Sequence, residues 1–438
     1  MFISEGVLAT QFETNYASTV FPCFDEPCIR STFEISIYSS LSDQVLSNMP
    51  LASSQVLFHK RISTFQTTPL MPVYLVGFSI GCFDSYHGHS KSGVPIDIYG
   101  PLDRCQLILP FAIDAIDFME DFTQIKYPLP RLQLVFIPNF IFGGMENNGI
   151  ITLNQNEGGA SYYASLVYHE VSHHWAGNLA TIKWWDSLWI PEGLASFFPY
   201  LISEKLENIP CHMEIIKHYS QRMLIKDSKP NIRPLQSCTG PETIFDSIAY
   251  TKGLLMMNSL RQWCGYDVFQ KSLQQLFHQF SFSTFDSNDF IKCFPENVKL
   301  IFESFLPQPS YPIAFLEENG SAYLKPFVKN DENINPKKKE ILMKRVYHLP
   351  IKILIGKDNS LIEKDIILGP NPIVIEEAKD ADFIKLNYKN FTYCRTYHDG
   401  KWLDALVKAG QDKKIHQIEV DFAKVDFTFI NDYMILKE

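Results

Sequence analysis

Two histidines four residues apart form the most informative pattern in the sequence. His169 and His173 flank Glu170 in the run HEVSH, inside the segment SYYASLVYHEVSHHWAG, whose apolar residues recur at helical spacing. Residues four apart on a helix share a face, so both imidazoles can direct a ring nitrogen at one metal ion. The pattern is typical of zinc sites in which the intervening glutamate acts as a general base. The alternative is a pair of histidines on an ordinary amphipathic helix.

A catalytic zinc site needs a third protein ligand and keeps one position open for water. Glu192 is the candidate, on a second helix that we expect to begin near Pro191, where a missing N–H is tolerated. Taken alone, Glu192 could equally be an acidic side chain that interacts with the dipole at a helix start. If this helix continues, Pro199 cannot donate to the carbonyl of Ala195 and is expected to kink it without moving Glu192.

Strand patterns precede and follow the helical part of the chain. Within residues 1–98, STFEISIYSS, TTPLMPVYLVGFSI and VPIDIYG alternate apolar stretches with turn residues and predict an all-β module. Helical periodicity begins at Pro110 and dominates to about Phe305, interrupted by the strand LQLVFIP and the turn FGGMENNG. Beyond the proline-rich segment LPQPSYP, further strand-like runs predict a small β-sandwich.

The composition is that of a globular protein with a sizeable core. Of 438 residues, 46% are hydrophobic and 20% are charged, and the net charge of −10 argues against a nucleic-acid partner. The nine cysteines are scattered and odd in number, which favours reduced thiols in a cytoplasmic protein over a disulfide framework. No run approaches the roughly 20 apolar residues of a membrane helix, and no signal-peptide pattern opens the chain. We therefore expect a soluble, cytoplasmic protein.

The longer run HEVSHHWAGNLATIKWWDSLWIPEGLA closely resembles the zinc-binding signature of the gluzincin aminopeptidases, the family of aminopeptidase N and puromycin-sensitive aminopeptidase. Three more blocks match in the same order: ATQFE with FPCFDEP, GGMENNGIITL, and IFDSIAYTKG. Weaker similarity runs through QPSYPIAF and FIKLNYKNFTYCRTYHD. Family members carry further β-structure before the ATQFE segment and a large helical domain after the sandwich, so the resemblance implies a chain shortened at both ends.

The resemblance implies a multidomain α+β fold. The expected parts are a partial amino-terminal β-sheet domain (1–98), a thermolysin-like catalytic domain (99–305), a β-sandwich (306–397) and a remnant of a carboxy-terminal helical domain or tail (398–438). In a shortened amino-terminal domain, we expect open strand edges and exposed apolar surface.

The resemblance also implies the catalytic roles. One zinc ion per chain would be held by His169, His173 and Glu192. Glu170 would take a proton from water and later hand it to the leaving amine. Tyr250, in the block FDSIAYTKG, would donate a hydrogen bond to the oxyanion. Read without the family, Tyr250 is one of 20 tyrosines and could lie in a core.

A further set of residues would bind the amino end of the substrate. The family pairs the substrate ammonium with the glutamates of its GxMEN loop and its TQxE strand, which fall here on Glu146 and Glu13. Gln11 would shape the pocket for the first side chain. Three residues would offer a backbone edge to which a peptide adds as a strand: Gly143, Gly144 and Met145. Without the family, FGGMENNG is a turn of clustered Gly and Asn.

Two positions depart from the family pattern. The family usually has Asn before the third ligand and an acidic residue two places before the last tryptophan. This chain has Pro191 and Ser187 there, with Asp186 beside the second position. Changes next to metal ligands can lower metal affinity or activity about 10–100-fold.

The sequence therefore predicts a zinc metallo-aminopeptidase that hydrolyses the first residue from peptides with a free amino-terminal amine. One alternative is a truncated homologue that folds and binds zinc or peptide with little or no turnover. A zinc endopeptidase is the third hypothesis. Glu13 and Glu146 argue against it, because they would disfavour a chain that passes through the site.

Overall fold

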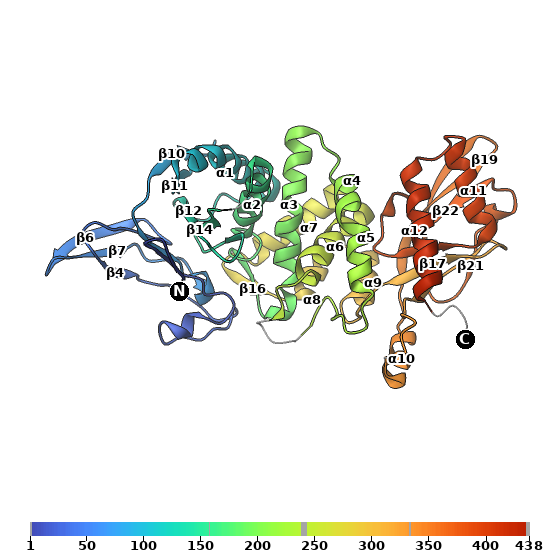
Figure 1. The fold of residues 1–438 in the computed structure, drawn as a ribbon, viewed down its shortest axis with the longest axis horizontal. Coiled ribbons are helices and arrows are strands. Elements are labelled where there is room, and N and C mark those ends of the chain that lie inside the picture. The colour runs from blue at the N-terminus through green and yellow to red at the C-terminus, as the bar shows by residue number, and fades with distance from the viewer. Residues whose placement is uncertain (1, 157, 238–242, 333, 435–438) are drawn as a thin grey trace. The chain divides into compact units, whose positions relative to one another are not determined.

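The computed structural model describes residues 2–156, 158–237, 243–332 and 334–434 (Figure 1). The chain forms two compact units. The first comprises Met1–Ile209, Cys238–Asp246 and Gln270–Cys293, and the second comprises Pro210–Ser237, Ser247–Phe269 and Phe294–Glu438. No helix in the described ranges is both long enough and apolar enough to cross a membrane.

The amino-terminal part of the first unit is built from short strands (Figure 1). An antiparallel four-stranded sheet has the order β1-β2-β9-β5, and an antiparallel three-stranded sheet has the order β4-β7-β6. Strands β3 and β8 form a separate pair. The bounds are β1 (Phe2–Ser4), β2 (Val7–Ala9), β3 (Arg30–Ser31), β4 (Ser36–Ser39), β5 (Gln44–Ser47), β6 (Leu51–Leu57), β7 (Lys60–Phe65), β8 (Met71–Pro72) and β9 (Phe78–Gly81).

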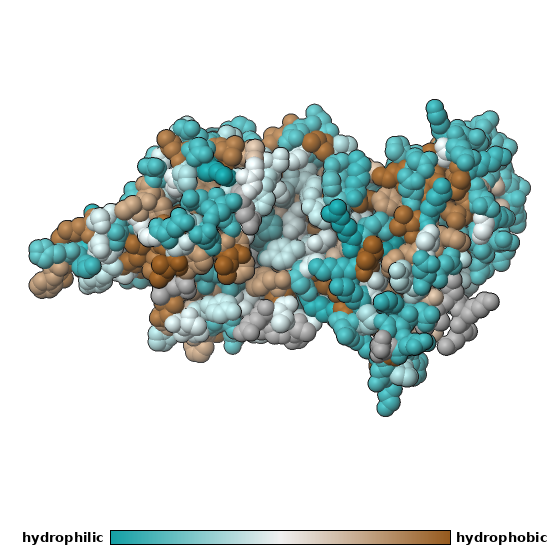
Figure 2. All heavy atoms as spheres, viewed as in Figure 1, coloured by the Kyte–Doolittle hydropathy of each residue, from teal (hydrophilic) through white to brown (hydrophobic). Residues whose placement is uncertain are grey.

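Strand β6 is an open edge of its sheet. All seven of its residues are exposed, and the side chains of Val56 and Phe58 are 66% and 88% exposed. Figure 2 shows hydrophobic surface at this hairpin. Open edges and exposed apolar surface were expected for this part of the chain, because unpaired strand edges leave both backbone and side chains to solvent.

A five-stranded mixed sheet forms the centre of the first unit. Its order is β10-β11-β12-β14-β13, with β11, β12 and β14 parallel and the two outer strands antiparallel. Every residue of β12 and β14 is buried, as expected for strands covered on both faces. The short strand β13 lies at one edge. The bounds are β10 (Ser85–His89), β11 (Pro95–Tyr99), β12 (Leu132–Ile137), β13 (Gly144–Met145) and β14 (Ile150–Asn154).

Helices pack beside this sheet and on one another. Helix α1 contacts β10, β11 and α2, and α2 contacts α3 (Figure 1). The parallel pair β15–β16 and the short helix α8 complete the unit. The bounds are α1 (Leu102–Thr123), α2 (Ala160–His173), α3 (Trp189–Glu207), β15 (Ala180–Ile182), β16 (Ser283–Phe285) and α8 (Ser287–Lys292).

Two helix starts differ from the sequence prediction. Helix α1 begins at Leu102 and runs through Pro110 instead of beginning there. Helix α3 begins at Trp189, so Pro191 is its third residue, and it continues through Pro199 to Glu207. Neither start has a side chain that caps it, so neither carried the usual sequence signal for a helix start.

The second unit combines helices with two small sheets. Its helical segments before the sheets are α4 (Cys211–Ile215), the π-helical turn η4 (Ile216–Ser220), α5 (Gln221–Asp227), the π-helical turn η6 (Ile248–Lys252), α6 (Gly253–Cys264) and α9 (Glu296–Phe305). Helix α7 (Tyr266–Gln279) contains the point where the chain passes from this unit to the first.

The sheets beyond Pro312 have the orders β21-β18-β17-β23 and β20-β19-β22. Helices α11 and α12 share a buried core with the second sheet, through Leu354 and Phe383 on the strands and Leu406 and Val420 on the helices. The bounds are β17 (Pro312–Leu316), β18 (Ser321–Pro326), α10 (Pro336–Met343), β19 (Leu349–Lys357), β20 (Ser360–Leu368), β21 (Ile373–Val374), β22 (Phe383–Lys385), β23 (Arg395–His398), α11 (Gly400–Gln411) and α12 (Gln417–Tyr433).

The structure confirms the predicted fold class. Strands dominate the amino-terminal part, helices dominate the middle, and strands return after the proline-rich segment. The boundaries of the four predicted domains stay a prediction.

Candidate functional site

The two predicted histidine ligands lie one turn apart at the end of α2. Their Nε2 atoms are 3.0 Å apart, and each lies 3.5 Å from Oε2 of Glu192 in the first turn of α3. His173 and Glu192 are buried, and the side chain of His169 is 18% exposed. The structure thus brings together the three residues that were predicted as metal ligands.

These three atoms fit a tetrahedral zinc ion. Ligand atoms about 2.1 Å from such an ion lie about 3.4 Å from one another. The two 3.5 Å separations match that spacing, the 3.0 Å separation of the two Nε2 atoms is somewhat shorter, and imidazole and carboxylate are donors that zinc accepts. Oε2 of Glu192 is buried without a well-formed hydrogen bond to any described residue. A cation held between the three side chains would satisfy this oxygen.

A backbone carbonyl holds each histidine ring on its other side. Nδ1 of His173 lies 3.0 Å from the carbonyl oxygen of Ala176, and the ring of His169 donates to the carbonyl oxygen of Ala195. Because a carbonyl oxygen only accepts, the ring nitrogen that faces it carries the proton. The opposite nitrogen then keeps its lone pair for a metal. Sequence reasoning missed both acceptors, since a backbone carbonyl has no residue-type signal.

Burial and mutual charge set the pKa values of the ligands. Burial lowers the pKa of His169. Burial also disfavours the charged form of His173, but the carboxylates of Glu146 and Glu192 outweigh it and raise the His173 pKa well above its usual value. For Glu192, burial is outweighed by the two histidines, which hold its pKa at about 2. Glu192 is therefore ionised over the whole range in which the protein is expected to work.

Glu170 is buried beside the edge strand β13. A Cβ atom added at Gly144 would lie 2.4 Å from Oε1 of Glu170, so any larger residue there would require the Glu170 side chain to move. Burial, followed by the charge of Glu146, raises the Glu170 pKa well above its usual value. A carboxyl group with a raised pKa holds a proton more tightly than an ordinary one, which suits a general acid–base group.

Glu13 and Glu146 place two more carboxylates next to Glu192. One oxygen from each of the three lies within 4.8 Å of the others, and all three residues are buried. Oε1 of Glu146 is also 4.0 Å from Nδ1 of His173. Burial raises the pKa of Glu146, and burial together with the Glu146 charge raises that of Glu13 well above its usual value. Two imidazoles cannot balance this many buried carboxylates, so the site favours cationic ligands.

Three side chains from other elements fasten the loop that carries Glu146. Asn178 donates to the carbonyl oxygen of Glu146 at 2.9 Å. Asn48 donates at 2.7 Å to the carbonyl oxygen two residues further along the loop. At the end of the loop, the amide of Gly149 donates to Nε2 of His174 at 3.1 Å. Sequence reasoning identified none of these three side chains, although His174 and Asn178 lie in the same run, HEVSHHWAGN, as the two histidine ligands that were predicted.

The other predicted substrate residues surround the same edge strand. Met145 pairs with Thr152 of β14, and Nε2 of Gln11 donates to Sδ of Met145 at 3.1 Å. The carbonyl oxygen of Gly143 accepts from the amide of Asn154 at 2.8 Å. Since β13 is the last strand of its sheet, its far side is an edge that an extended peptide can join.

Tyr250 belongs to the second unit. It is half-buried on the π-helical turn η6, which ends at Lys252. Lys252 is fully buried and forms a 2.8 Å ion pair with Asp227, so this turn is firmly held within its own unit. The role of Tyr250 at the metal centre stays a prediction.

The departures from the family pattern lie close to the third ligand in the chain. Ser187 bonds to Asp186 and to Ser287, each at 3.1 Å, and Pro191 directly precedes Glu192 in α3. The Oγ atom of Ser287 also accepts from the indole N–H of Trp189 at 3.2 Å. These contacts anchor the start of α3 through hydroxyl groups, one of which donates to the Asp186 carboxylate.

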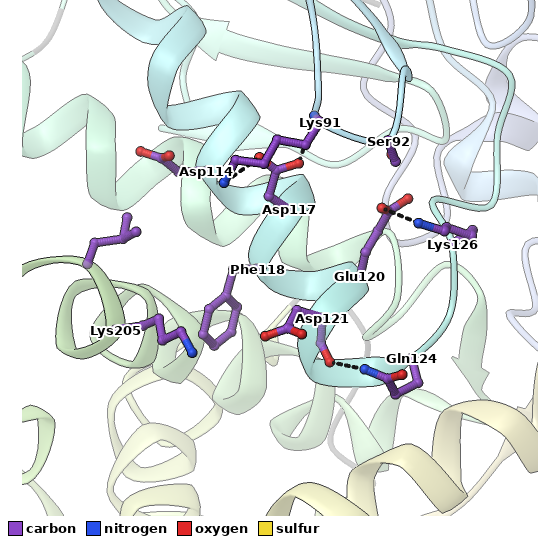
Figure 3. Close-up of a pocket in the computed structure, with 11 residues that line it drawn as sticks. Lys91, Ser92, Asp114, Asp117, Phe118, Glu120, Asp121, Gln124, Lys126 and Lys205 are labelled. Atoms are coloured by element: carbon purple, nitrogen blue, oxygen red, sulfur yellow. Dashed lines mark hydrogen bonds and ion pairs between the residues drawn. The ribbon is translucent and has the colours of Figure 1, made fainter.

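A separate hollow of about 570 Å³ lies along α1 (Figure 3). Two of the carboxylates on its wall are already paired. Asp117 lies 3.4 Å from Lys91, and Glu120 lies 3.2 Å from Lys126. Among the described residues that line it there is no histidine or cysteine. We therefore assign the chemistry to the cluster around His169 and His173.

Comparisons with known proteins give a consistent result. The family model described as "Peptidase family M1 domain" matches residues 109–308, and that described as "Peptidase M1 N-terminal domain" matches residues 4–75. The chain is 31% identical to "Aminopeptidase N" of Lactococcus lactis subsp. lactis over 341 residues, 71% of this chain and 40% of that protein.

Two further relatives match over longer stretches. "Probable aminopeptidase 2" of Sulfurisphaera tokodaii is 29% identical over 422 residues, 90% of this chain and 52% of that protein. "Puromycin-sensitive aminopeptidase" of Caenorhabditis elegans is 28% identical over 428 residues, 91% of this chain and 45% of that protein. The chain thus spans about half the length, or less, of these relatives.

Replacing Glu146 with Gln is expected to stabilise the zinc-depleted protein. Burial raises the pKa of Glu146 above the ordinary 4.5, so the folded state binds a proton more tightly than the unfolded state does. The carboxylate therefore lowers stability increasingly as the pH rises above about 4.5. By scanning calorimetry, we expect the Tm of the Glu146→Gln variant to exceed that of the wild type by a few degrees at pH 8 and to match it near pH 4.

Glu419→Gln is the matched control for this measurement. Glu419 is also buried, but it lies 3.6 Å from the buried ammonium of Lys385 and accepts from the amide of Lys389 at 3.1 Å. Removing its charge leaves Lys385 unpaired and should lower the Tm. A Glu146→Gln variant that is less stable than the wild type at pH 8 would contradict the proposed excess of buried negative charge.

Proposed function

The chain belongs to the M1 peptidase family, and on this basis we propose that it is a zinc-dependent aminopeptidase that removes the first residue from peptides with a free amino end. One observation carries the proposal. A set of candidate metal ligands (His169, His173 and Glu192) and a pair of buried carboxylates (Glu13 and Glu146) meet within a single compact unit. The first set suits a divalent metal and the second suits an ammonium group.

The chain's own residues supply the proton transfer. Zinc, when bound, would act as a Lewis acid on the peptide carbonyl and lower the pKa of a water molecule. Glu170 accepts the proton of the attacking water on its carboxylate and delivers it to the departing amine nitrogen. Its raised pKa favours the protonated form after the first transfer, so the proton remains available for the second.

The edge strand and the anionic pair position the substrate. The backbone of the peptide adds to β13, where Gly144 leaves room for the Glu170 carboxylate. The ammonium group pairs with Glu13 and Glu146. One carboxylate oxygen of each lies within 4.8 Å of the other and of an oxygen of the ligand Glu192. Since the amino end is held that close to the metal ligands, the first peptide bond is the one that meets Glu170. Gln11, in contact with Met145, shapes the space for the first side chain.

We assign Tyr250 as the donor to the oxyanion. This assignment rests on the resemblance of FDSIAYTKG to the family block, and the phenol O–H is a donor of the required kind.

The second candidate function is binding of zinc or peptide with little turnover. The observation that favours it is the change of residues at the start of α3, where Pro191 and Ser187 stand in place of the Asn and the acidic residue of the family pattern. Such changes near a ligand lower activity in other metal sites.

Glu170→Gln separates these two functions. The amide cannot accept the proton of water, so we expect kcat for an aminoacyl fluorogenic amide to fall about 100–10,000-fold. Zinc content, measured by atomic emission, should stay at one per chain because Glu170 is not a ligand. Glu207→Gln, at the exposed end of α3, is the control and should behave as the wild type. A wild type that holds zinc but shows no turnover above that of Glu170→Gln would support binding without catalysis.

Charge recognition at the amino end gives a second test. Acetylation removes the ammonium, so an N-acetylated version of the same amide should be cleaved at least about 100-fold more slowly. Glu146→Gln should raise KM for the free-amine substrate about 10-fold or more, because one of the two carboxylates that pair with the substrate ammonium is lost. Steady-state kinetics on both substrates measures both effects. Equal cleavage of the acetylated substrate would instead favour an endopeptidase.

A further inference from the structure

Helix α3 carries a proline in its interior. The helix runs without interruption from Trp189 to Glu207, and Pro199 lies in its middle. A proline has no backbone N–H, so the carbonyl four residues earlier, that of Ala195, loses its helical hydrogen bond. Ala195 is fully buried, so bulk water does not reach it as a substitute donor. A buried carbonyl of this kind needs another partner.

That partner is the first metal ligand. The ring of His169 donates to the carbonyl oxygen of Ala195. Nε2 of the same ring is turned toward Nε2 of His173, at 3.0 Å, and toward the Glu192 carboxylate, at 3.5 Å. The donor to Ala195 is therefore Nδ1, and the tautomer that results leaves the Nε2 lone pair directed at the metal position.

His173 obtains the same support in a different way. Its Nδ1 donates to the carbonyl of Ala176, which lies in the turn beyond the end of α2. Carbonyls at a helix end are free because the helix offers them no donor. Ala195, by contrast, lies in the interior of a helix, where its carbonyl would ordinarily be occupied. Pro199 is what makes an interior carbonyl available.

We propose that Pro199 is a positioning residue of the metal centre: it frees the Ala195 carbonyl, which orients His169 for metal binding. This inference rests on the proposed function, since it concerns the same zinc site. It also changes the interpretation of Pro199. At the level of sequence Pro199 was a potential disruption of the helix that carries Glu192, whereas the structure gives it a part in holding the ligand on the neighbouring helix.

The chain contains a natural control for this inference. Pro110 likewise lies inside a helix, α1, in the same unit. The residue four positions earlier, Gln106, is exposed, so water can reach the carbonyl that Pro110 frees. Pro110 therefore shares the effect of proline on a helix but has no connection with the metal ligands.

The test compares Pro199→Ala with Pro110→Ala in the full chain. Alanine is the best helix former, so both variants should fold. In Pro199→Ala, the new N–H competes with His169 for the Ala195 carbonyl. We expect the zinc dissociation constant, measured by competition with a chromophoric chelator, to rise about 10-fold or more for Pro199→Ala. It should stay within about twofold of the wild type for Pro110→Ala.

A second readout distinguishes orientation of the ligand from a general loss of structure. We expect the Tm of zinc-depleted Pro199→Ala to equal or exceed that of the zinc-depleted wild type, because a helical hydrogen bond is restored. Weaker zinc binding with undiminished stability supports the inference. A zinc dissociation constant equal to that of the wild type, or a loss of affinity matched in Pro110→Ala, overturns it. A wild type that binds no zinc overturns both the inference and the proposed function.

Discussion

The first unit buries more negative charge than its own cations can balance. Carboxylates from four glutamates surround the rings of His169 and His173, and burial raises the pKa of three of them: Glu13, Glu146 and Glu170. A protein core accommodates such a group either with a compensating cation or by keeping it protonated. The site has two parts that follow from this constraint. One lies between the side chains that suit a divalent metal, and the other lies between the carboxylates of Glu13 and Glu146, which suit an ammonium group.

The fold meets this constraint with elements that are rigid and deeply buried. The predicted metal ligands lie on two packed helices, the predicted general base faces the edge of a central sheet, and the loop with Glu146 is tied down by Asn48, His174 and Asn178. Backbone carbonyls fix the two imidazole rings. In the proposed function, positions held this firmly keep the distance between the metal ligands and the amine site constant, and that distance would select the first peptide bond.

Sequence reasoning succeeded where the candidate residues lie close together in the chain and one local element fixes their spacing. His169 and His173 could be paired because one helix determines both positions, and the clustered Gly and Asn around Gly144 indicated a turn, whereas the sheet edge there needed the family resemblance. Glu192 needed the family resemblance, because nothing local distinguishes a ligand from a helix-start carboxylate. Asn48 carried no signal at all, since it reaches its loop from a hundred residues away in the chain.

Other differences have a similar physical origin. Helix α3 starts before Pro191 and passes through Pro199 because tertiary burial of its part up to Ile202 outweighs the local preference of proline. The helices α11 and α12 lacked a clear prediction, and their packing against β19 and β22 depends on contacts between distant segments.

The position of a bound zinc ion tests the central claim most directly. Anomalous diffraction from a crystal of the zinc-loaded chain, recorded at the zinc absorption edge, would locate it. The account predicts one peak per chain, about 2.1 Å from Nε2 of His169, Nε2 of His173 and a carboxylate oxygen of Glu192. A peak elsewhere in the molecule, or a chain that crystallises with zinc in solution and shows no peak between these three side chains, would contradict it.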